Sequence, residues 1–144
     1  MPDSVGDVYQ RIVKATRRAP EGRCPECAYL EPSRIVWEDE HWVLLRADGA
    51  DDLAAALLLQ TREHSRVGQL DDELASQFGR ISNRLVRIIE SQPEAEYVDV
   101  SRYGANRGHF HVWFHAPFAD GTTQPVDLHT VATKLANWGG DARA

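Results

Sequence analysis

The segment GHFHVWFH, residues 108–115, alternates two kinds of side chain. In a β-strand, successive side chains point to opposite faces of the sheet. One face of this segment carries the apolar residues Phe110, Val112 and Phe114. The other face carries His109, His111, Trp113 and His115. The pattern predicts a strand whose apolar face packs on a hydrophobic core. Its opposite face carries the side chains that could bind a metal or act in catalysis.

The three histidines of this face have two interpretations. They can be solvated or satisfied by backbone groups, as many core histidines are. Neutral imidazole can also serve as a metal ligand, a general base or a nucleophile. The chain has only six histidines, and three of them share one face of one short segment. This concentration favours a chemical role, because a partly buried imidazole is costly unless it makes a hydrogen bond, binds a metal or takes part in catalysis.

Length and charge limit what such a strand can belong to. A chain of 144 residues fits one domain with its own core, so we expect a single domain over 1–144. The formal net charge of -6 argues against a broad surface for DNA or RNA, and any phosphate site must be local. No apolar run reaches membrane-spanning length, and the first residues lack the apolar core of a secretory signal. We therefore expect a soluble, cytoplasmic protein.

Hydrophobic periodicity predicts the remaining elements. The apolar run over 51–61 does not distinguish a buried strand from a helix, and we interpret it as a strand. The segment 70–91 has the clearest helical stripe, with Asp71 as its N-cap. The other predicted elements are a helix over 4–20, two strands over 33–47 joined by a turn at 38–40, a strand over 94–103 and a short helix over 126–137.

The motif CPEC places Cys24 and Cys27 three positions apart, which is a poor disulfide framework. The pair can be redox-active, half of a zinc site, or an inert feature of a turn. No strand–CPEC–helix pattern supports a redox pair of the thioredoxin type. A tetrahedral zinc ion needs two further donors, for which His64 and one histidine of 108–115 are available. We favour the metal site.

Taken together, these segments resemble the histidine triad (HIT) superfamily of nucleotide hydrolases and transferases. The resemblance covers about residues 24–117: CPEC, a strand pair, an apolar strand ending in REH, a helix opening with LDDE and a final H-x-H strand. It implies an α+β fold with a mostly antiparallel sheet and helices packed mainly on one side. It also implies a homodimer, because family members usually form one.

The resemblance assigns roles to individual residues. In this family the middle histidine of the motif attacks the α-phosphate of a nucleotide, and that role falls on His111. In the zinc-binding branch, which includes galactose-phosphate uridylyltransferases, two C-x-x-C cysteines, a histidine after the preceding strand and the first motif histidine bind a structural zinc. Those positions correspond to Cys24, Cys27, His64 and His109.

The sequence departs from the family pattern on the same strand. Trp113 stands where the third motif histidine is expected, and His115 comes two positions later. The Gln and Ser that contact phosphate before the motif appear here as Ala105 and Asn106. We expect Asn106 and backbone N–H groups of the GANRG turn to hold phosphate oxygens, and Trp113 and His115 to line the nucleotide pocket. Packing against a neighbouring helix is an equal alternative for Trp113.

The implied function is hydrolysis or transfer at the α-phosphate of a nucleotide or nucleotide conjugate. Neutral His111 attacks in line, and water or an acceptor then resolves the nucleotidyl-histidine. A backbone carbonyl that receives the other ring proton is expected to fix the tautomer of His111. The alternative is a zinc-stabilised nucleotide-binding module without turnover.

Overall fold

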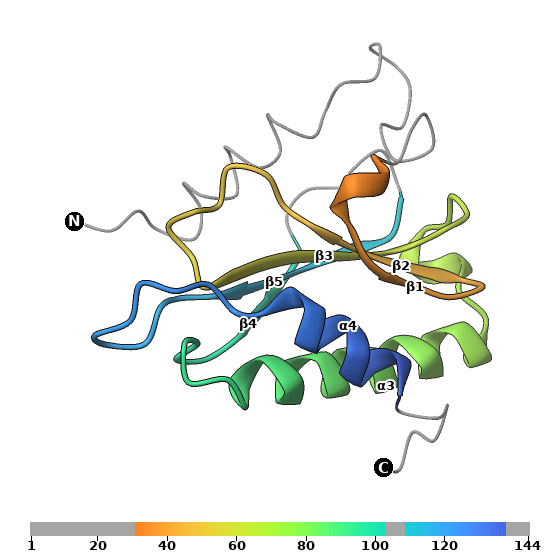
Figure 1. Cartoon of the computed structure of the whole chain (residues 1–144). Coiled ribbons are helices and arrows are strands. Elements are labelled where there is room, and N and C mark those ends of the chain that lie inside the picture. Colours follow the sequence, from red (N-terminus) through yellow and green to blue (C-terminus); the bar gives the residue numbers. More distant parts are fainter. Residues whose placement is uncertain (1–30, 103–108, 138–144) are drawn as a thin grey trace.

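The computed structural model describes residues 31–102 and 109–137 (Figure 1). Its elements in chain order are η1 (Pro32–Arg34), β1 (Ile35–Glu38), β2 (Trp42–Arg46), β3 (Ala55–Thr61), η2 (Val67–Gln69), α3 (Asp72–Glu90), β4 (Asp99–Ser101), β5 (His111–Ala116) and α4 (Leu128–Ala136). The predicted strands over 33–47 and 51–61 and the helices over 70–91 and 126–137 are confirmed. The predicted helix over 4–20 lies outside the described residues.

The five described strands form one sheet in the order β1-β2-β3-β5-β4, and every neighbouring pair is antiparallel. β3 lies in the middle of the sheet, and all seven of its residues are buried. A strand that is buried on both faces needs apolar side chains at nearly every position, which explains the continuous apolar run. The predicted α+β fold with a mostly antiparallel sheet is confirmed.

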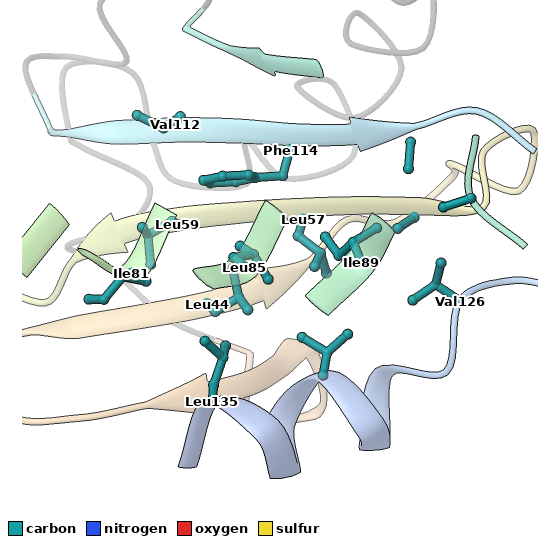
Figure 2. Close-up of a cluster of buried hydrophobic side chains, with 14 of the residues drawn as sticks. Leu44, Leu57, Leu59, Ile81, Leu85, Ile89, Val112, Phe114, Val126 and Leu135 are labelled. Atoms are coloured by element: carbon teal, nitrogen blue, oxygen red, sulfur yellow. The ribbon is translucent and has the colours of Figure 1, made fainter. Parts of the chain in front are cut away.

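Helices α3 and α4 cover the same face of the sheet (Figure 1). Figure 2 shows how this helical face is packed: side chains of the sheet meet side chains of both helices in one core. The labelled residues of this core include Leu44, Leu57 and Phe114 from the sheet, Leu85 from α3 and Leu135 from α4. Each fully buried side chain of this kind contributes about 1.5–3 kcal/mol of transfer free energy. The predicted packing of helices on one side is confirmed.

Helix α3 begins where the sequence predicts. The Asp71 side chain accepts a hydrogen bond from the backbone N–H of Leu74 at 2.8 Å, which satisfies one of the free N–H groups of the first turn. Ile81, Leu85 and Ile89 follow at four-residue spacing and are buried against the sheet. No helix in residues 31–102 and 109–137 is both long and apolar enough to cross a membrane.

The strand predicted over 94–103 is shorter than expected. Only Asp99–Ser101 pair regularly with β5, while Ala95 makes an isolated bridge to Phe118. The backbone N–H of Val98 donates to the Glu90 carboxylate at 3.1 Å instead of to a neighbouring strand. The alternating pattern therefore extends beyond the regularly paired residues, although the backbone N–H of Glu96 still donates to the Pro117 carbonyl at 3.1 Å.

Candidate functional site

The predicted chemical face of the last strand is present in β5. His111, Trp113 and His115 have exposed fractions of 1%, 3% and 0%, and they lie on the face opposite α3 and α4. In the neighbouring strand β3, the residues directly opposite them are Gln60, Leu58 and Ala56. The apolar face of β5 packs into the helical core, so the hydrophobic core and the candidate site lie on opposite faces of the same strand.

The His111 ring is oriented by the backbone of its own segment. Its Nδ1 lies 2.9 Å from the carbonyl oxygen of His109. A carbonyl oxygen can only accept, so Nδ1 carries the proton and donates it in this hydrogen bond. In a neutral ring, the lone pair is then on Nε2. This is the tautomer expected for a histidine that attacks through Nε2, and the expected backbone carbonyl is that of His109.

His109 lies two residues before the start of β5 and is completely buried. Its Nε2 donates to the carbonyl oxygen of Thr61 at 2.7 Å, which leaves the lone pair of a neutral ring on Nδ1. The exposed His64 lies beside it, with the ring centroids 5.2 Å apart and the rings at 80°. The structure thus brings together two of the residues predicted to bind zinc, from segments 45 positions apart in the sequence.

These two imidazoles fit a shared zinc ion in distance and chemistry. Rings that bind one tetrahedral zinc through nitrogens at about 2.0–2.1 Å have their centroids roughly 5 Å apart. A ligand histidine usually donates its remote N–H to a carbonyl or carboxylate, as His109 donates to Thr61. Cys24 and Cys27 lie outside the described residues, and within the described ranges no three His, Cys, Asp or Glu residues cluster.

Trp113 and His115 form a stacked pair on the same face. Their ring centroids are 5.6 Å apart and the rings are inclined by 21°. Burial lowers the pKa of His115 from its usual 6.5 to about 4, against the opposing effect of the Asp99 carboxylate. His115 is therefore neutral at physiological pH. Trp113 packs in a second cluster made of strand and loop residues, Val43, Leu45, Leu53, Ala56 and Leu58, with no residue of α3 or α4.

No protein-family model matches the sequence, and a search of curated proteins finds no match. Among solved structures, a hypothetical histidine triad nucleotide-binding protein from Sulfolobus tokodaii superposes with a TM-score of 0.58 at 15% identity, over 79% of this chain and 93% of that one. The chain has the histidine triad fold.

Two further structures share the HIT fold. A HIT-like protein from Bartonella henselae, described as involved in cell-cycle regulation and solved with an unknown ligand, gives a TM-score of 0.52 at 16% identity, over 73% of this chain and 85% of that one. A zinc-bound histidine triad family protein from Mycobacterium smegmatis gives 0.50 at 15% identity, over 76% and 88%. The comparison therefore confirms the predicted fold.

Sequence reasoning missed one polar residue on this face of the HIT fold. Gln60 is 1% exposed and stands directly opposite His111 in the β3–β5 register. The available signal was a single amide at the end of the apolar run 53–59, but only the register places it beside the proposed nucleophile. Asn106, the residue expected to hold phosphate oxygens, lies outside the described residues.

Proposed function

We propose that this protein is a nucleotide hydrolase or nucleotidyltransferase that acts at an α-phosphate through His111. The observation that carries the proposal is the hydrogen bond from His111 Nδ1 to the His109 carbonyl, because it leaves the Nε2 lone pair for attack. The HIT fold supports it, since one protein of similar fold is described as a histidine triad nucleotide-binding protein.

The proposed reaction has two displacements at the same phosphorus atom. Nε2 of His111 forms a bond to the α-phosphorus, and the bond from phosphorus to the leaving group breaks, with the electron pair going to that group. Water or an acceptor hydroxyl then attacks the phosphorus, and the phosphorus–nitrogen bond breaks with its electron pair going to Nε2, which returns neutral His111. The proton of the attacking hydroxyl goes to the departed leaving group or to solvent. In the intermediate the ring is positively charged, so the hydrogen bond from Nδ1 to the carbonyl becomes stronger.

The other predicted contacts have separate roles in this proposal. Asn106 holds phosphate oxygens. The stacked rings of Trp113 and neutral His115 offer a flat apolar surface suited to the nucleoside.

Zinc has a structural role in the proposal. Cys24, Cys27, His64 and His109 would hold the ion in a closed tetrahedral site, which orders the polypeptide without binding substrate. The ring of His109 would bind the metal while its carbonyl accepts the proton of His111 Nδ1. Ordering His109 therefore also orders the nucleophile. The homodimer implied by the resemblance stays a prediction, for which β1 and β4 are the two outer strands of the sheet.

The test is release of nucleoside monophosphate from a panel of nucleoside polyphosphates and nucleotide phosphoramidates. We expect His111→Ala to lower the rate by at least about 1000-fold, because the covalent step is lost. The control is His41→Ala, which changes an exposed histidine in the turn between β1 and β2. Quenched reactions of the wild type should contain an acid-labile phosphorus–nitrogen adduct on the peptide spanning 109–115.

Two outcomes would reject the proposed enzymatic activity or its mechanism through His111. Nucleotide binding by the wild type with neither adduct nor monophosphate would identify a zinc-stabilised nucleotide-binding module, and the replacement of the third motif histidine by Trp113 favours that alternative. Undiminished turnover in His111→Ala would exclude the covalent mechanism.

A further inference from the structure

Gln60 lies beside His111 in the sheet, and the proposed reaction gives it no role. It is the sixth residue of β3, and its side chain lies on the same face as His111, because directly opposed residues of an antiparallel pair share a face. The Cα atoms of such pairs are about 4.5–5.5 Å apart. The amide of Gln60 can therefore reach a group bonded to the His111 ring.

The side-chain amide of Gln60 is buried and makes no hydrogen bond within residues 31–102 and 109–137. Among the described residues, neither Oε1 nor Nε2 has a partner, although the residue is only 1% exposed. On its other side in the sheet it is paired with the apolar Val43. A buried amide that has lost its water and gained no partner destabilises the folded chain. Such a cost directly after the apolar run of β3 points to a ligand.

Gln77 shows that a glutamine in this fold can be hydrogen-bonded at both of its polar side-chain atoms. Its Oε1 accepts from the indole N–H of Trp42 at 3.0 Å, and its Nε2 donates to Glu73 at 3.2 Å. Gln77 lies on α3, on the helical side of the sheet. Gln77, whose side-chain amide has partners and which lies away from His111, is therefore a control for Gln60.

We propose that Gln60 is a substrate-binding residue of the His111 site, and that its Nε2 donates hydrogen bonds to a non-bridging oxygen of the phosphoryl group. This inference rests on the proposed function, since it takes the phosphoryl group to be the one that His111 attacks. An amide N–H matches an anionic phosphoryl oxygen, which only accepts. The Oε1 atom then accepts from the hydroxyl of the water or acceptor that resolves the intermediate.

The experiment compares Gln60→Met with Gln77→Met. Methionine is unbranched and similar in length to glutamine, and it has no strong hydrogen-bonding group. Binding of the four common nucleoside 5′-monophosphates is measured by calorimetry, together with turnover and the thermal midpoint. We expect Gln60→Met to weaken nucleotide binding by about 10-fold or more and to raise the thermal midpoint. Gln77→Met should lower the thermal midpoint and keep the wild-type affinity.

The outcomes separate this inference from the proposed function. One outcome is that the wild type binds nucleotide without forming an adduct and Gln60→Met binds it more weakly. This result supports the substrate-binding role of Gln60 and rejects the proposed enzymatic activity. Another outcome is that the wild type forms the adduct and Gln60→Met keeps the wild-type affinity and rate. This result supports the proposed enzymatic activity and overturns the substrate-binding role of Gln60. Failure of the wild type to bind any of the four nucleotides overturns both. Should Gln60→Met not fold, Gln60→Leu is measured against the same outcomes.

Discussion

At the scale of single residues, His115 links burial to acid sensitivity. Burial lowers the pKa of its ring to about 4 in the folded chain, whereas an unfolded chain has the ordinary value of 6.5. Between these values the unfolded chain binds the proton and the folded chain does not. Folding stability should therefore be complete above pH 6.5 and should decrease as the pH falls toward 4. The full difference corresponds to about 3 kcal/mol.

The comparison of the wild type with His115→Leu tests this prediction. Urea unfolding at several pH values between 4 and 7.5 should give a steeper loss of stability for the wild type than for the variant. Proton binding by the proposed zinc ligands affects both proteins equally, so the difference between them isolates His115. Parallel curves would contradict the assignment of this acid sensitivity to His115.

Sequence could predict those residues of the site whose placement depends only on the two-residue alternation of side chains in a strand. A period of two places His111, Trp113 and His115 on one face whatever the rest of the fold is. Gln60 was not predictable, because its proximity to His111 depends on the register between β3 and β5, which no local pattern contains. The carbonyl that orients His111 was expected in kind but not in position.

At the scale of elements, the start of α3 depends on one side chain. Asp71→Ala removes the acceptor for the Leu74 N–H and should cost about 1 kcal/mol of folding free energy. Asp71→Asn keeps an acceptor oxygen and should retain most of the stability. Thermal unfolding of the two variants measures the difference. Equal midpoints for both would show that water replaces the cap without cost.

The elements also show where sequence patterns lose information. β3 is apolar at almost every position because strands lie on both sides of it and side chains pack on both faces, which removes the alternation that identifies a strand. β4 has the opposite problem. Its alternation begins before Asp99, but the regular pairing with β5 covers only Asp99–Ser101.

At the scale of the whole molecule, zinc is expected to connect distant segments. Purified protein should contain about one zinc ion per chain, the loading of a closed four-ligand site. Cys24→Ser, His64→Ala and His109→Ala should each lower both the zinc content and the thermal midpoint. His111→Ala should keep its zinc while losing turnover. Elemental analysis of the four variants tests the assignment, and full zinc content in the first three would exclude it.

The overall architecture was predictable only through the resemblance. Periodicity indicated strands and helices, and it contains nothing on strand order. The insertion of β5 between β3 and β4 requires pairing between residues more than 50 positions apart, such as Ala55 with Ala116. The resemblance to HIT proteins supplied the sheet and the placement of its helices, and the structure confirmed both.

The stack of Trp113 on His115 gives the fold an internal optical reporter. An excited indole loses its energy readily to a protonated imidazole in contact with it, and much less to a neutral one. The fluorescence of Trp113 should therefore be bright while His115 is neutral and dim once the ring takes up a proton. The chain has four tryptophans, of which Trp37 and Trp42 pack in the core on the opposite face of the sheet, so the signal is the part of the emission that depends on Trp113. The emission of one native side chain thus reports the charge of its neighbour without any added label.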